Sequence, residues 1–144
     1  MKSLLSQWYI WAMLSACFAA LTAIFGKVGV ENIDSNLATL IRTALILMIV
    51  ALVAAGTGSY RVPANITLNT WIFLALSSLA TGFSWLCYYR ALKLGSAAGV
   101  ASIDKLSVLI VAILSVIFLG ERLMIWNWMG IGMIAIGAIL VAVR

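Results

Sequence analysis

Long apolar runs separated by short polar links are the main pattern of this chain. Five runs are long enough to cross a bilayer, since a spanning helix needs about 20 mainly apolar residues. They cover residues 8–30, 33–55, 70–92, 97–119 and 124–143. Helices satisfy their own backbone hydrogen bonds in lipid. The pattern therefore predicts an all-α fold, a polytopic membrane bundle of five transmembrane helices in a single domain over residues 1–144.

The links between the runs contain residues that begin and end helices. Asp34 and Ser35 offer N-cap oxygens to the second helix. Gly95 and Gly120 suit the C-terminal caps of the third and fourth helices. Because the links after those two helices are short, each helix is expected to run antiparallel to the next.

Composition supports a lipid environment. The chain is 65% hydrophobic and 9% charged, whereas a soluble domain carries about 25% charged residues. The net charge of +5 comes from basic residues placed singly between apolar runs, so we expect lipid headgroups rather than nucleic acid as their partners. Cys17 and Cys87 fall inside apolar runs and are interpreted as small buried hydrophobic residues. We expect a multi-pass protein of the cell membrane.

Aromatic residues support the count of five spans. Five of the six tryptophans fall at the starts of the first, third and fifth helices, and they are Trp8, Trp11, Trp71, Trp126 and Trp128. With antiparallel neighbours, those starts share one face of the membrane, called side A here. Tryptophan prefers the membrane–water interface, so these residues are predicted to form one belt at side A.

Basic residues are almost equally divided between side A and the opposite side B. Side A has Lys2, Arg61 and Arg122, and side B has Lys27, Arg90, Lys93 and Arg144. Cytoplasmic loops normally carry excess Lys and Arg. The balance leaves two alternatives open, a fixed orientation or insertion of copies in both orientations.

Three ionisable residues lie well inside predicted spans, namely Arg42, Asp104 and Lys105. Each costs about 2.5–3.5 kcal/mol at a helix centre, so such residues usually mark function. Arg42 and Asp104 lie about 10–14 Å deep from side B, which makes Arg42 the best candidate partner for Asp104. Asp104 and Lys105 are adjacent and should point about 100° apart, so they are not expected to pair. The charges form either an ion pair that fixes helix packing or part of a substrate cavity.

Polar side chains recur at helical spacing beside these charges. The faces are Ser77, Thr81, Ser84 and Tyr88 with Trp85 on the third helix, Ser35, Thr39 and Arg42 on the second, and Asp104, Ser107 and Ser115 on the fourth. Such faces can converge on a wet interior. The alternative for any single Ser or Thr is a bond to its own helix, or an interhelical bond worth about 0.6 kcal/mol.

The fifth helix has small residues where the others have polar ones. Gly132, Ala135, Ala138 and Ala142 share a face and would allow close approach of another helix. This helix is interpreted as scaffold or as a dimer contact, with ordinary packing inside one copy as the alternative.

Enzyme chemistry is not expected. The chain has no His, no paired-carboxylate signature, no nucleotide-binding loop and no nucleophile with a base. We therefore expect neither an enzyme nor a bound cofactor or metal.

Three stretches resemble the EamA domain of the drug/metabolite transporter superfamily. They are Thr81-Gly82-Phe83-Ser84-Trp85, Tyr88-Tyr89-Arg90-Ala91-Leu92 and Phe118-Leu119-Gly120-Glu121-Arg122. Asp34-Ser35-Asn36, Arg42-Thr43 and Ile103-Asp104-Lys105-Leu106-Ser107 are similar to the single-unit, five-span members. The resemblance implies relatives that usually fuse two such units and export metabolites, amino acids or drugs.

A single unit has a consequence for assembly. Two fused five-helix units lie inverted in the membrane, because five is odd. An unfused copy is therefore expected to work as a homodimer, antiparallel or parallel, or with a second inverted protein.

The leading hypothesis is a secondary transporter, an exporter of a small metabolite or amino-acid-like solute that works as a dimer by alternating access. The predicted substrate-binding residues are Arg42, Asp104, Lys105, Trp85, Tyr88, Ser84 and Ser107. Arg42 and Lys105 would hold an anionic or zwitterionic group, and Asp104 a cationic group or a coupling proton. The alternatives are a multidrug exporter of lipophilic cations and a non-transporting membrane subunit.

Overall fold

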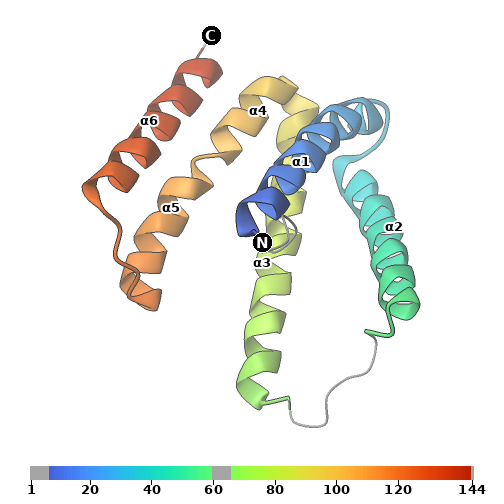
Figure 1. The fold of residues 1–144 in the computed structure, drawn as a ribbon. Helices are drawn as coiled ribbons and strands as arrows, with labels where there is room; N and C mark the ends of the chain where they lie inside the picture. The colour runs from blue at the N-terminus through green and yellow to red at the C-terminus, as the bar shows by residue number, and fades with distance from the viewer. Residues whose placement is uncertain (1–6, 60–65, 144) are drawn as a thin grey trace. The chain divides into compact units, whose positions relative to one another are not determined.

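The protein is all-α (Figure 1). The computed structural model describes residues 7–59 and 66–143. The elements are α1 (Trp8–Val30), α2 (Ser35–Gly56), α3 (Leu68–Leu94), α4 (Ala97–Asp104), α5 (Ser107–Leu114), the π-helical turn η2 (Ser115–Leu119) and α6 (Ile125–Ala142).

Five stretches of the described chain are long and apolar enough to cross a membrane. They are Trp8–Val30, Ser35–Gly56, Leu68–Leu94, Ala97–Leu119 and Ile125–Ala142. Each lies within two residues of the predicted boundaries, so the predicted fold class is confirmed. The protein is a multi-pass membrane protein.

The chain divides into two compact units. The first, called the α2–α3 unit, covers Gly29–Lys93. The second, called the α4–α6 unit, joins Met1–Val28 to Leu94–Arg144 and therefore includes most of α1. The single-domain prediction stays a prediction.

The α2–α3 unit has its core where α2 begins and α3 ends. Asp34 caps α2 as predicted, because its Oδ1 atom accepts hydrogen bonds from the Asn36 and Leu37 amides at 2.8 and 3.3 Å. The Lys93 ammonium donates to the Ile33 carbonyl and ties the end of α3 to this cap. The buried side chains are Ser35, Ala38 and Thr39 from α2 and Tyr89 and Leu92 from α3. Packing thus fixes this end of the helix pair.

In the α4–α6 unit, α4 and α5 both pack against α6 (Figure 1). Lys27 Nζ, near the end of α1, donates to the Gly95 carbonyl at 2.8 Å. Ser96 then caps α4 by accepting from the Gly99 amide at 3.2 Å. Ala138, on the small-residue face of α6, is buried. Ordinary packing accounts for that part of the face, and a dimer contact through α6 stays a prediction.

The fourth predicted helix is interrupted near its middle. α4 ends at Asp104, and α5 begins at Ser107. Across this break, Lys105, Leu106, Val108 and Leu109 each donate to the carbonyl three residues earlier, at 2.9–3.1 Å. This is the tighter 3₁₀ pattern. The sequence prediction of one continuous helix over residues 97–119 missed this break.

The same span ends in a second irregularity. Its last turn, η2, is π-helical, and Gly120 follows in the left-handed region with φ 66°. Glycine adopts this conformation at little cost, so the predicted C-terminal cap at Gly120 is confirmed.

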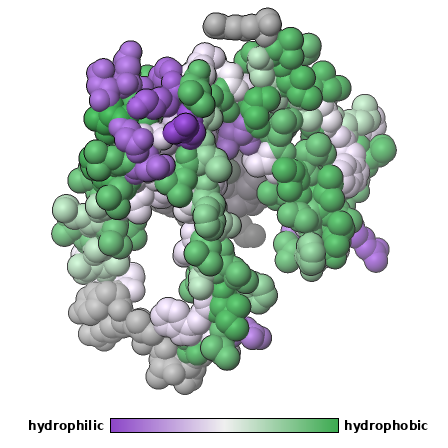
Figure 2. Space-filling model, turned by 180° about the vertical axis from the view of Figure 1, so that it is seen from behind, coloured by the Kyte–Doolittle hydropathy of each residue, from purple (hydrophilic) through white to green (hydrophobic). Residues whose placement is uncertain are grey.

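Most large apolar side chains are exposed, as expected for helices in lipid (Figure 2). Cys17 and Cys87 are free and exposed, so their prediction as buried residues is wrong. Apolar residues in a membrane can face lipid as readily as the protein interior, and composition does not separate the two. Hydrophilic side chains gather where α2 begins and α3 ends (Figure 2).

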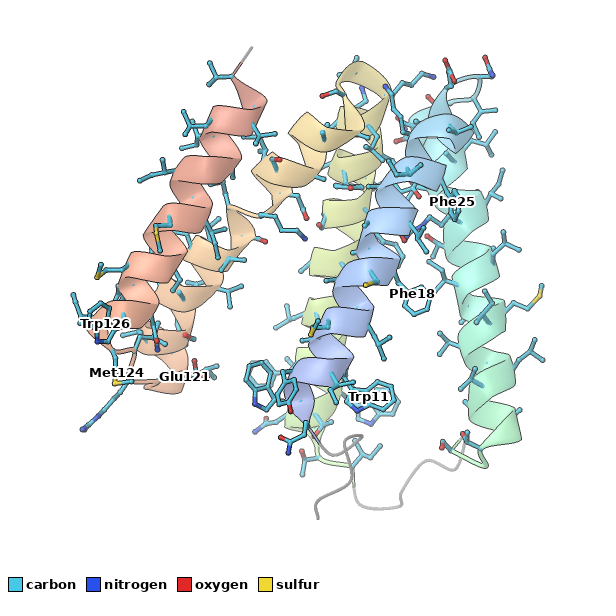
Figure 3. The ribbon with its side chains drawn as sticks, turned by 45° about the horizontal axis from the view of Figure 1, so that its top comes forward. Trp11, Phe18, Phe25, Glu121, Met124 and Trp126 are labelled. Carbon is cyan, nitrogen blue, oxygen red and sulfur yellow. The ribbon has the colours of Figure 1, made fainter. Side chains whose placement is uncertain are left out.

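Aromatic residues begin α1 and α6 in the α4–α6 unit. Trp11 and Trp126 lie toward the same end of this unit (Figure 3). Trp126 is close to Met124 and Glu121, which lead into α6 (Figure 3). This agrees with an interfacial belt for these two residues. Lys2, Arg61 and Arg144, three of the counted basic residues, lie outside the described residues.

Candidate functional site

The first charged group of interest is Arg42, which lies about two turns into α2. Its Cζ atom is 4.6 Å from the centroid of the Trp85 ring and 5.3 Å from that of Tyr89. Both rings belong to α3 and are four residues apart, so they share one helix face. Tyr89 is only 4% exposed. A guanidinium over an aromatic ring is attracted by about 2 kcal/mol when both are desolvated.

Arg42 has no carboxylate partner in the described part of the α2–α3 unit. The ion pair found among the described residues belongs to the other unit and joins Asp104 to Lys105. The predicted pair between Arg42 and Asp104 would link the two units, and it stays a prediction. Among the described residues of its own unit, Arg42 contacts the Trp85 and Tyr89 ring faces.

Tyr89 was missed as a site residue, and the sequence predicted Tyr88 instead. The four-residue spacing from Trp85 to Tyr89 was the available signal. The two tyrosine rings meet edge to face, with centroids 6.3 Å apart. Ser84 lies on α3 one residue before Trp85 and is exposed. The structure thus brings Trp85 to Arg42 and leaves the predicted roles of Tyr88 and Ser84 as predictions.

Hydroxyl groups near these residues largely bond to their own helices. Thr39 Oγ1 donates to the Ser35 carbonyl at 2.8 Å, and Thr43 Oγ1 to the Thr39 carbonyl at 2.7 Å. Thr81 Oγ1 donates to the Ser77 carbonyl at 2.9 Å. The alternative foreseen for single Ser and Thr residues is therefore confirmed at these three threonines. Their oxygen atoms can still accept a bond.

The second charged group lies at the break between α4 and α5. Lys105 Nζ is 4.0 Å from Asp104 Oδ2. The prediction that these neighbours do not pair is wrong, because the flexible Lys105 side chain can bring its ammonium back toward the Asp104 carboxylate although the two Cβ directions diverge. The Lys105 and Asp104 side chains remain 56% and 44% exposed. Pairs this long and open are weak, so both charges stay accessible.

Two serines of the predicted polar face follow the break. Ser107 is the first residue of α5 and is exposed. Ser115 is buried, and its Oγ donates to the Ala112 carbonyl at 3.1 Å. The exposed Ser107 hydroxyl can therefore reach a ligand beside the charged pair, whereas the Ser115 hydroxyl bonds to its own helix. The predicted site residues fall into one group in each unit, and their convergence on a single cavity stays a prediction.

A third set of charges lies outside the spans, at the start of α2. The amides of Asn36 and Leu37, by bonding to the Asp34 carboxylate, hold its pKa below the usual value of 3.8. Lys93 and Arg90 act in the same direction by charge. Asp34 is therefore a structural cap.

Five apolar spans, two of which carry charged residues well inside them, define a multi-pass membrane protein whose intramembrane charges mark a functional site. The sequence model of the EamA-like transporter family matches residues 6–143. The chain belongs to this family, which confirms the resemblance.

Two curated relatives are similar over nearly the whole chain. One is an uncharacterized transporter in the cobO 3′ region of Sinorhizobium sp., 60% identical over 95% of this chain and 97% of its own length. The other is the uncharacterized transporter YxxF of Bacillus subtilis (strain 168), 27% identical over 100% of this chain. The chain spans 45% of that second relative. No solved structure matches the chain. The family points to a transporter rather than an enzyme.

Proposed function

We propose that this protein is a secondary transporter that exports a small metabolite or amino-acid-like solute across the cell membrane. One observation carries the proposal: among the described residues of each unit, the charged side chains within the spans have no strong protein partner. Arg42 meets only aromatic rings within its described unit, and the Asp104–Lys105 pair is long and open. Such charges are expensive in lipid. A polar solute that binds them offsets this cost.

The break between α4 and α5 supports alternating access. Transporters commonly place their sites at interrupted helices, where freed backbone and side chains meet the substrate or coupling ion. Short 3₁₀ stretches inside helices often act as hinges. In this proposal α5 moves relative to α4 about Lys105 and Leu106, and the charges at the hinge respond to the bound solute.

The working unit in this proposal is a homodimer. The Bacillus relative is more than twice as long as the matched stretch, so it has room for two such units in one chain. An unfused five-span chain reaches the same arrangement by association of two copies. An antiparallel pair would be inverted, as fused units with an odd number of spans are.

The solute contacts are proposed from the two described groups. Arg42 and Lys105 hold an anionic or zwitterionic group, with Trp85 and Tyr88 as an aromatic wall. Asp104 binds a cationic group or carries a coupling proton, and Ser84 and Ser107 add hydroxyl contacts.

A second candidate is an exporter of lipophilic cations. It is favoured by the Trp85 and Tyr89 rings, which already hold one cation in the form of the Arg42 guanidinium. Such an exporter requires Asp104 to be free of Arg42, and it requires Arg42 to leave the rings. Binding of a quaternary ammonium compound that depends on a carboxylate, and is therefore lost at low pH, would support it.

Solute flux in proteoliposomes tests the proposal. A panel of radiolabelled amino acids and organic acids identifies a transported solute, which is then measured with the Asp104→Asn variant. The matched control is Glu121→Gln, which neutralises an exposed carboxylate between η2 and α6. We expect Asp104→Asn to lower the initial rate at least tenfold and Glu121→Gln to preserve it. Undiminished flux in Asp104→Asn would remove Asp104 from the mechanism, and the absence of flux for every solute would contradict this class of transport.

A further inference from the structure

We propose that Arg42, held against the Trp85 and Tyr89 rings, binds the carboxylate group of an organic solute. This inference rests on the proposed transport function and names the chemical class that this group of residues selects. Organic carboxylates are favoured over cations and over neutral molecules of the same shape.

The available hydrogen-bond donors of Arg42 carry the argument. A guanidinium has five N–H donors in a planar fork. In the described α2–α3 unit, its contacts are with the two rings, at 4.6 and 5.3 Å from their centroids, and no carboxylate lies within 4.0 Å. Ring faces attract the charge but offer no oxygen to the N–H groups. The donors are therefore unmatched by protein acceptors in this unit.

The membrane makes unmatched donors costly. Arg42 lies about 10 Å along α2 from Ser35, the first residue of the candidate span, and is therefore well inside that span. A polar group in that region is stabilised when it is hydrogen-bonded. Because Arg42 is only partly buried, a ligand can reach it. A solute with its own acceptor oxygens meets this requirement.

A carboxylate fits a guanidinium better than other common groups do. Two parallel N–H···O bonds join the two planar groups, and this pairing is stronger and more directional than a single contact. Lysine presents a point charge and cannot reproduce it. Replacement of Arg42 by Lys is therefore predicted to weaken binding of the carboxylate. The site is also predicted to bind an anion in preference to a cation.

The rings have a positioning role. Tyr89 is buried and Trp85 is partly buried, so packing restrains both. They hold the guanidinium in place before a ligand arrives, which lowers the entropy lost on binding. Trp85 and Tyr89 thus act through Arg42, and any aromatic ring at position 85 should retain part of the effect.

Three probes with the same ring and different charge test the inference. Benzoate, benzyl alcohol and benzyltrimethylammonium are added at constant ionic strength to the purified chain in a nonionic detergent, where no lipid headgroup competes. A ligand that binds the folded state raises the melting temperature in a saturable manner. We expect saturable stabilisation by benzoate and none by benzyl alcohol.

The variants then assign the effect to Arg42. Benzoate stabilisation should disappear in Arg42→Gln, and its apparent Kd should rise at least tenfold in Arg42→Lys. Trp85→Leu should weaken benzoate binding, and Trp85→Phe should restore part of it. Arg42→Lys keeps the charge, so it remains informative if Arg42→Gln does not fold. Control variant Arg90→Gln, near the end of α3, should bind benzoate like the wild type.

Several results would overturn the inference. They are equal stabilisation by benzyl alcohol, benzoate binding that persists in Arg42→Gln, and a preference for benzyltrimethylammonium that grows when Arg42 is neutralised. The last result would indicate that the Trp85 and Tyr89 rings bind a cationic ligand instead. Solute flux with no carboxylate binding would refute this inference alone, and carboxylate binding with no flux would refute the proposed function alone.

Discussion

The ammonium of Lys105 lies 4.0 Å from the carboxylate of Asp104, at the point where α4 has ended and α5 has not begun. Adjacent residues on a continuous helix diverge by about 100°. A 3₁₀ turn also separates neighbours, by about 120°, so the flexible four-carbon stem of Lys105 is what brings its ammonium to this distance. The charges and the interruption of the helix therefore belong to one local feature.

Water should reach the predicted polar face of each unit. We expect Ser84→Cys in the α2–α3 unit and Ser107→Cys in the α4–α6 unit, each made in a Cys17→Ala and Cys87→Ala background, to react with a charged, membrane-impermeant thiol reagent in proteoliposomes. A polar cavity admits the reagent, whereas lipid excludes it. The measurement is the labelled fraction over time.

Leu79→Cys serves as the control for that labelling. Leu79 is exposed on α3 and points about 140° away from Ser84 on an ideal helix. It should remain unlabelled. Equal labelling at positions 79 and 84 would mean that water reaches both sides of α3, and it would contradict a water-filled cavity on the Ser84 side.

The Asp34 cap should make stability depend on pH in the acid range. Its carboxyl pKa is lower in the folded protein than the usual 3.8, so the folded state favours the charged form. The stabilisation is complete above the unfolded pKa and is lost as pH falls through the folded pKa. Asp34→Ala should lower the melting temperature at pH 7 and reduce the further decrease seen below about pH 4.

Asp34→Asn separates the cap from its charge. Asparagine can accept the same amide hydrogen bonds, so this variant should keep most of the stability at pH 7 and lose the acid dependence. A melting temperature at pH 7 that is equal in wild type and Asp34→Ala would show that the cap contributes nothing.

Gly120 should resist substitution because its φ is 66°. An L side chain in this region costs about 1–2 kcal/mol, so Gly120→Ala should unfold at lower denaturant. Gly82→Ala is the control, since Gly82 lies inside α3 with open space around the position of a Cβ atom. Alanine favours helix over glycine by about 1 kcal/mol. Gly82→Ala should therefore be neutral or stabilising, and equal losses in both variants would contradict the backbone argument.

Sequence alone predicted the helices well and the site in part. Apolar runs set the spans, and the oxygen of Asp34 and the flexibility of Gly120 set two of the ends. The break after Asp104 was missed because no Pro or Gly lies between Ser102 and Ser107 to indicate it. Its position depends on packing and hydrogen bonding around the span, which periodicity does not encode.

The ring contacts of Arg42 were not predicted from the sequence. Trp85 and Tyr88 were predicted as an aromatic wall for the substrate, Tyr88 because it continues the serine and threonine stripe. In the structure Tyr89 joins Trp85 at Arg42, since a ring four residues after Trp85 lies on the same side of α3. Polar periodicity and aromatic periodicity pointed to different faces, and only the contact with α2 distinguishes them.

The central claim is that both intramembrane charge groups act on one transported solute. The most direct measurement is the initial rate of solute flux in proteoliposomes for Arg42→Gln, Lys105→Gln and the double variant, with Arg90→Gln as control. If both groups serve one solute, each single variant lowers the rate at least tenfold, and the double variant is little worse than either, because coupled residues are non-additive. Wild-type rates in both single variants would contradict the account.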